Sequence, residues 1–197
     1  LLTEKSGVLN LGVEGMMLLG AVSAFATALN TGSAWTGMLA GTVAGALAAL
    51  LFAFLVLRLL TNQTATGLAL TILGTGLSAL LGVKYVGLSV QGFAPLNIPV
   101  LSKLPLIGEL FNQSIPAYLG ILLCVLFGVL LFKSKIGLMV RAVGESPSVA
   151  QWIGYDVLKI RYAMTLLGGA MAGFAGAFVA LVQFKAAARG DRVHFRV

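Results

Sequence analysis

Charged residues are scarce in this chain. Lys, Arg, Asp and Glu make up 10% of its 197 residues, whereas soluble domains carry about 25%. So few charges cannot cover a water-exposed surface, and the mean hydropathy of +1.01 points the same way. The composition excludes an ordinary soluble domain. It indicates an all-α membrane protein, a polytopic transmembrane helix bundle.

Cysteine and histidine are almost absent. Cys124 is the only cysteine and lies in an apolar stretch, so neither a disulfide framework nor a thiolate metal site can form within one chain. His194 is the only histidine, and no carboxylate pair lies within a predicted membrane helix, as a proton relay would need. The P-loop pattern GxxxxGK[ST] is also missing. We therefore predict no enzymatic activity, no metal and no resident cofactor.

Basic residues outnumber acidic ones, which gives a net charge of +7. They stand between apolar runs and form no patch on a polar domain. Retention of Lys and Arg on the cytoplasmic side of a lipid bilayer accounts for this pattern better than nucleic-acid binding.

Apolar runs long enough to cross a membrane occur four times, at 34–57, 65–83, 116–132 and 162–182. A fifth run, 16–29, spans only if it extends back through Asn10 and Glu14; otherwise it re-enters. With about five segments, the connections on one side carry seven Lys and Arg and those on the other carry two. Loop 133–161 is therefore predicted to be cytoplasmic.

Small residues recur at helix-packing intervals inside these runs. In lipid, close backbone approach supplies much of the association energy between helices. We expect a tightly packed bundle around Gly37, Gly41, Gly45, Gly169 and Gly173.

Loop 133–161 contains signals for one short helix. Ser146 suits the N-cap, Pro147 suits the first helical position and Gly154 suits the stop. These signals predict a helix over 147–153, held between two spans.

Polar residues also lie at or near the ends of the membrane segments. Asn10, Glu14, Asn62, Thr64 and Thr66 are candidates for a solute pathway, because lipid exposure of such groups is costly. Helix capping and hydrogen bonding between helices are the alternative roles. Glycines around Asn10 and Glu14 favour a broken helix there.

Two segments resemble a known family. Residues 141–147 (RAVGESP), followed by Ala150 and Gly154, resemble the coupling loop of ABC importer permeases of the branched-chain amino acid, simple-sugar and nucleoside superfamily. Residues 4–17 (EKSGVLNLGVEGMM) are more specific. They are similar to the nucleoside and simple-sugar branch that is served by basic membrane lipoprotein binding proteins, as are residues 62–70.

The resemblance implies a permease subunit of an ATP-driven importer for nucleosides or simple sugars, located in a bacterial inner membrane. Its partners would be a second permease subunit, ABC ATPase subunits that hold ATP and Mg²⁺, and an extracytoplasmic lipoprotein binding protein facing Pro116 and loop 84–115. A permease for branched-chain amino acids and an ion-coupled secondary transporter are the alternatives. The residues that would meet the ATPase are Arg141, Gly144, Glu145, Ser146, Pro147, Ala150 and Gly154.

The last residues differ in composition from the rest. Residues 1–182 read as one partial permease domain, whereas 183–197 form a polar tail with four basic residues and one acid. We expect this tail not to be the family's sequence and the chain to be an incomplete or frameshifted copy. A genuine short tail is the alternative.

Overall fold

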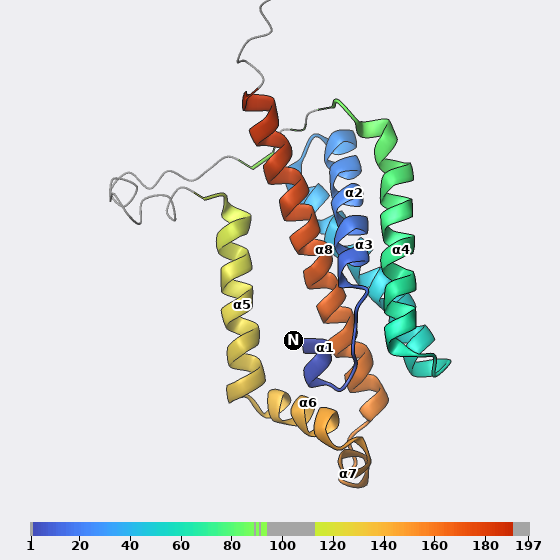
Figure 1. Cartoon of the computed structure of the whole chain (residues 1–197). Helices are drawn as coiled ribbons and strands as arrows, with labels where there is room; N and C mark the ends of the chain where they lie inside the picture. Colours follow the sequence, from blue (N-terminus) through green and yellow to red (C-terminus); the bar gives the residue numbers. More distant parts are fainter. Residues whose placement is uncertain (1, 89, 91, 94–112, 191–197) are drawn as a thin grey trace, which may run out of the picture.

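Five long helices dominate the computed structural model, which describes residues 2–88, 90, 92–93 and 113–190 (Figure 1). All five are long and apolar enough to cross a membrane, which confirms the predicted number of spans. The run 16–29, left open by the sequence, belongs to a spanning-length helix that extends back through Glu14 but not through Asn10. The long helices are α2 (Val13–Thr31), α3 (Ala34–Ala53), α4 (Gln63–Gly82), α5 (Ile115–Lys133) and α8 (Val157–Gly190).

Short elements join the long helices. Loop 133–161 holds two helices where the sequence analysis expected one over 147–153. The helix that was missed is amphipathic, since Gly137, Val140 and Val143 are buried on one face of it. The short elements are α1 (Leu2–Lys5), the π-helical η1 (Phe54–Arg58), the 3₁₀-helical η2 (Val83–Tyr85), α6 (Lys135–Glu145) and α7 (Pro147–Trp152).

The packing glycines lie where α2, α3 and α8 meet. A Cβ added to Gly41 would lie 2.6 Å from the carbonyl oxygen of Gly20 on α2, and one on Gly45 would lie 2.6 Å from the Cα of Gly173 on α8. Gly37 faces α2 in the same way, and Gly169 faces α3. These backbones approach so closely that a side chain at any of the positions would force two helices apart.

A second close approach joins α4 to α2. A Cβ on Gly74 would lie 2.6 Å from the Cα of Gly15, and one on Gly67 would lie 2.9 Å from the backbone nitrogen of Leu11. The first turn of α2 therefore rests against the middle of α4, not against its beginning.

The corner between α5 and α6 is also tightly built. The Ser134 hydroxyl accepts a hydrogen bond from the Gly137 backbone N–H (3.1 Å) and donates to the Leu130 carbonyl (2.5 Å). Beyond the corner, buried Leu131, Val140 and Met164 form a cluster that ties α5 and α6 to α8. Farther along, α5 lies close to α8 where a Cβ added to Gly120 would be 3.8 Å from the Phe174 ring, and otherwise it lies at the side of the bundle (Figure 1).

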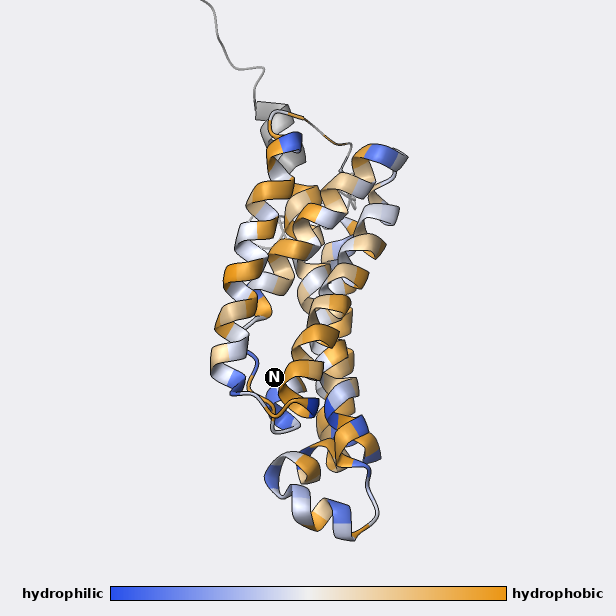
Figure 2. Cartoon of the chain, turned by 90° about the vertical axis from the view of Figure 1, so that its right-hand side faces the viewer, coloured by the Kyte–Doolittle hydropathy of each residue, from blue (hydrophilic) through white to orange (hydrophobic). Residues whose placement is uncertain are grey.

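Hydrophilic residues concentrate at the two ends of the bundle (Figure 2). One end, called the basic end here, holds α1, η1, α6, α7 and the start of α8. These elements and their immediate neighbours carry Lys5, Arg58, Lys133, Lys135, Arg141, Lys159 and Arg161.

Two sequence expectations concern the opposite end. Loop 84–115 lies outside the described residues over 89, 91 and 94–112, while Pro116 is buried at the start of α5. The apolar span of α8 ends at Val182, but the helix itself continues to Gly190. The first part of the predicted tail 183–197 is therefore helical, and residues 191–197 lie outside the described part of the chain.

Candidate functional site

Helix α7 ends in a well-defined glycine motif. Gly154 has a left-handed φ of +97°. Its N–H donates to the Gln151 carbonyl, and the Tyr155 N–H donates to the Ala150 carbonyl, both at 3.0 Å. This is the Schellman arrangement, which stops a helix and fixes the direction of the chain that follows. At the other end Ser146 occupies the N-cap position and Pro147 the first turn, as predicted, although the Ser146 side chain makes no capping hydrogen bond.

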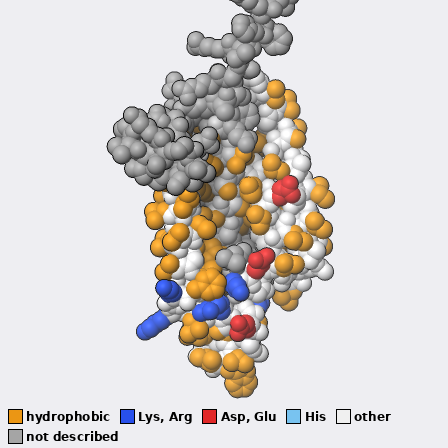
Figure 3. Space-filling model, turned by 60° about the vertical axis from the view of Figure 1, so that its left-hand side comes forward, with side chains coloured by type: hydrophobic (Ala, Val, Ile, Leu, Met, Phe, Trp, Pro, Cys, Tyr) orange, Lys and Arg blue, Asp and Glu red, His pale blue; other side chains and the backbone are white. Residues whose placement is uncertain are grey.

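Three apolar side chains are exposed on α7 and at its C-cap, alongside the polar residues Ser148 and Gln151. Val149, Trp152 and Ile153 are 55%, 91% and 68% exposed, and we call these three side chains the α7 tip. Helix α7 lies at the bottom of the molecule in Figure 1, and Figure 3 shows hydrophobic side chains at this end, below a group of Lys and Arg side chains. Ala150, predicted to contact a partner, is 1% exposed and is therefore a packing residue of α7.

The remaining coupling candidates lie on α6 and at its junction with α7. Glu145 is exposed, whereas Ser146 and Pro147 are half-buried. The Arg141 guanidinium lies 5.8 Å from the Phe132 ring centroid. Its Nε is buried without a hydrogen-bond partner among the described residues. Arg141 thus braces the α5–α6 corner and does not reach the α7 tip.

Gly144, at the end of α6, packs against residues 3–7, which we call the N-terminal turn. The turn is closed by the Ser6 N–H and the Ser6 hydroxyl, which donate to the Thr3 carbonyl at 3.1 and 2.6 Å. A Cβ on Gly144 would overlap the carbonyl oxygen of Lys5. On the other side, the Arg161 Nε donates to the Ser6 carbonyl at 3.1 Å. The two sequence motifs at 4–17 and 141–154 are therefore in direct contact.

From the turn, the chain continues into the membrane bundle along α4. Buried Val8 joins the core cluster that contains Phe52 of α3 and Leu70 of α4. The Leu9 N–H donates to the Gln63 side-chain oxygen at 2.7 Å, and Leu11 lies beside Gly67. Contacts thus run without a break from α6 through the N-terminal turn to α2 and α4.

The five pathway candidates fall into two groups on adjoining segments. The Asn10 side-chain oxygen accepts from the Gly12 N–H at 2.9 Å, just before the first turn of α2, where Glu14 is exposed. The second group lies at the start of α4, and its polar atoms serve local structure. The Asn62 oxygen caps α4 by accepting from the N–H groups of Thr64 and Ala65 at 3.0 and 3.2 Å.

In the second group, Thr64 is exposed. The Thr66 hydroxyl pairs with that of Thr61 at 2.9 Å. Asn62 therefore has the alternative role of a helix cap, whereas the Glu14 carboxylate makes no hydrogen bond or ion pair within the described part of the chain.

A cleft of about 530 Å³ lies beside α7 at the basic end and is lined by Gln63, Gln151, Tyr155, Asp156 and Arg161, among others. Hydrogen bonds from the Lys159 side chain and N–H hold the pKa of Asp156 below its usual value. Within the described part of the chain, no group of three or more His, Cys, Asp or Glu side chains could hold a metal ion.

Five residues with a place in the structure were not predicted from the sequence: Trp152, Arg161 and three hydroxyl residues of α4. The sequence placed Trp152 and Arg161 only in a loop. The exposure of Trp152 and the hydrogen bond of Arg161 to Ser6 depend on how α7 and α8 pack in the folded chain. Thr71, Thr75 and Ser78 of α4 carried a readable signal, namely hydroxyls at intervals of four and three, which places them on one helix face.

Residues 1–196 match the protein family described as the branched-chain amino acid transport system / permease component. A permease protein of Haloferax volcanii, provisionally named for glucose transport, is 41% identical over 92% of this chain. The nucleoside permease NupC of Lactococcus lactis is 34% identical over 90%, and the guanosine permease NupQ of Bacillus subtilis is 32% identical over 88%.

The chain spans 56%, 60% and 59% of the lengths of these three relatives. No solved structure matches it. The family match covers nearly the whole chain, and the relatives agree with the five spans in describing a multi-pass membrane protein. The chain belongs to the branched-chain amino acid transport system / permease component family.

Proposed function

We propose that this chain is part of the membrane-spanning permease subunit of an ATP-driven importer for nucleosides or simple sugars. In this proposal a separate ABC ATPase binds ATP and Mg²⁺, a second permease subunit completes the pathway, and an extracytoplasmic lipoprotein delivers the solute. The solute class is supported by the names of the three relatives, one given for glucose and two for nucleosides or guanosine.

The observation that carries the proposal is the construction of the α6–α7 unit. An isolated apolar tip on a helix of six residues would be out of place in water unless a partner covers it. Among the side chains that the structure describes, Trp152 is the most exposed of the large apolar ones, and tryptophan is enriched where partners bind most strongly. The basic residues beside the tip support a cytoplasmic location, where an ATPase would stand.

The unit is also joined firmly enough to transmit a movement. A displacement of α7 would move α6, and α6 contacts the N-terminal turn through Gly144 and Lys5. The turn continues into α2 and α4 through buried Val8 and the Leu9–Gln63 hydrogen bond. We infer that this route carries the movement of the ATPase to the membrane helices.

The test is uptake by the complete importer, reconstituted in liposomes with its ATPase and binding protein. Uptake of labelled guanosine and glucose would be measured with ATP, with a non-hydrolysable ATP analogue, and with an imposed proton or sodium gradient. We expect uptake of one solute only with ATP and binding protein. Uptake driven by an ion gradient alone would contradict the proposal and favour a secondary transporter. Uptake of leucine instead of either solute would favour the branched-chain amino acid alternative.

A further inference from the structure

Glu14 is an exposed carboxylate at membrane depth. It belongs to the first turn of α2, whose neighbour Gly15 packs against Leu70 and Thr71 of α4. Helix α4 begins at Gln63 on the basic end. At 1.5 Å per residue, Glu14 therefore lies about 10 Å deeper than the start of α4. A charged group at this depth is costly in lipid, so such residues face water or protein.

Hydroxyl groups continue from Glu14 along α4. Thr71, Thr75 and Ser78 repeat at intervals of four and three, which places them on one face of the helix. The Thr71 hydroxyl lies 3.1 Å from the Leu11 carbonyl, beside the start of α2, and the Thr75 hydroxyl donates to the Thr71 carbonyl at 2.8 Å. With their hydrogens bonded to the backbone, these oxygens remain acceptors for the hydroxyl groups of a solute.

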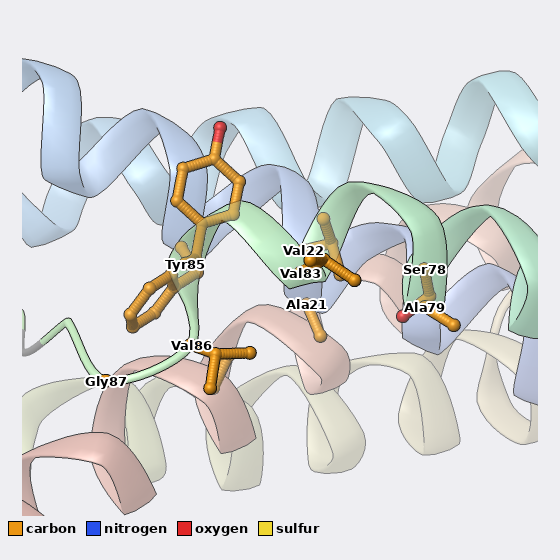
Figure 4. Close-up of a pocket in the computed structure, with 11 residues that line it drawn as sticks. Ala21, Val22, Ser78, Ala79, Val83, Tyr85, Val86 and Gly87 are labelled. Carbon is orange, nitrogen blue, oxygen red and sulfur yellow. The ribbon is translucent and has the colours of Figure 1, made fainter.

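The hydroxyl face leads into a cavity of about 490 Å³ at the end of the bundle opposite the basic end. Figure 4 shows Ala21 and Val22 of α2 and Ser78 and Ala79 of α4 along this cavity, with Tyr85 nearby. The α2 residues Glu14, Ala21 and Phe25 are separated by seven and four positions, so Glu14 lies on the face of α2 that lines the cavity.

We propose that this strip, made of Glu14, Thr71, Thr75, Ser78 and Tyr85, is one wall of the solute path and binds a neutral hydroxylated solute. The carboxylate and hydroxyl oxygens accept hydrogen bonds from the solute, and the Tyr85 and Phe25 rings provide apolar surface for a sugar or a base. The cavity is of the size usual for small-molecule sites. This inference rests on the proposed function and adds residues to it.

The test is cysteine labelling in the complete importer, with Cys124→Ser as the background. Thr75→Cys and Ser78→Cys would be compared with Leu73→Cys and Leu80→Cys, which lie on the opposite face of the same helix and are exposed. The probe is a membrane-impermeant charged methanethiosulfonate, which reacts with thiolate in water and poorly with a thiol in lipid. We expect the first pair to react at least ten times faster, and guanosine or glucose to slow that reaction.

Glu14→Gln provides a second readout. It removes the charge and keeps the shape, so we expect the KM for uptake to rise roughly tenfold, which is about the loss expected for one hydrogen bond to a charged group. Equal labelling of the two helix faces, or an unchanged KM, would overturn the solute path. The labelling rates can be measured whether or not the importer takes up solute. Failure of the importer to take up either solute would therefore contradict the proposed function without deciding whether the strip faces water.

Discussion

Arg161 at the start of α8 donates from Nε to the carbonyl oxygen of Ser6, 155 residues earlier in the chain, at 3.1 Å. Together with the packing of Thr3 against Gly168 of α8, this bond fastens the N-terminal turn to α8. The turn is also held from the α6 side, where Gly144 lies against Lys5. Residues from three distant parts of the sequence therefore meet at one point of the basic end.

Arg161→Ala should loosen this junction. A hydrogen bond to a charged group contributes about 1.5–3 kcal/mol, so we expect a lower thermal unfolding midpoint and fewer solute molecules transported per ATP hydrolysed. Lys159→Ala is the control, because Lys159 carries the same charge nearby but has an 84% exposed side chain and only a surface ion pair. If both variants behave alike, Arg161 has no special part in the junction.

Gly144→Ala should be destabilising, although alanine favours helices over glycine by about 1 kcal/mol. The added Cβ would overlap the Lys5 carbonyl, so α6 and the N-terminal turn must separate. Gly128→Ala on α5 is the matched control, since nothing lies within 4 Å of a Cβ there. We expect opposite signs for the two changes in unfolding free energy, measured by thermal melting in detergent. The same sign at both positions would count against the contact.

Trp152→Ala should leave folding intact and weaken binding of the ATPase. The side chain is 91% exposed, so its removal creates no cavity. A buried aromatic anchor at a protein interface contributes at least about 2 kcal/mol, or roughly thirtyfold in Kd. Binding of the purified ATPase would be measured by surface plasmon resonance, with Trp152→Phe and Leu59→Ala as controls. If Trp152→Ala binds the ATPase as tightly as the unaltered protein, the α7 tip is not part of the ATPase interface.

Gly41→Leu should disrupt the packing of α2, α3 and α8. A Cβ at Gly41 already lies 2.6 Å from the Gly20 carbonyl and 2.7 Å from Ala177, and overpacking a well-packed core costs about 1–3 kcal/mol or more. Gly76→Leu, on a helix face with nothing within 4 Å, is the control. The fraction of folded protein in mixed detergent micelles would be compared for the two variants. Equal losses would show that Gly41 is not at a tightly packed helix contact.

Much of the fold could be predicted from the sequence, because lipid leaves few choices. An apolar run of sufficient length must be a helix, and α3, α4, α5 and α8 appear where such runs occur. The start of α2 was harder to predict, since Glu14 and the nearby glycines interrupt the apolar run. Helix α6 was not predicted, because it is only 11 residues long and its buried face consists of Gly137, Val140 and Val143.

The candidate site could be predicted only in part, for a physical reason. Local signals such as Pro147 and Gly154 specify where α7 begins and ends, because capping is a property of neighbouring residues. Which side of α7 is exposed depends on packing with other elements, so burial of Ala150 and exposure of Trp152 could not be read from spacing. The contact between Gly144 and Lys5 depends on the whole fold.

The glycine contacts of the core also constrain the order of events during synthesis. Helices α2 and α3 follow each other directly and can pair as soon as both have entered the membrane, through Gly37 and Ala24. Gly45 has its partners on α8, at Gly169 and Gly173, which leave the ribosome only after α4 and α5. The surface of α3 around Gly45 must therefore remain uncovered while α4 to α7 are made, and the three-helix core cannot close until α8 has entered the membrane.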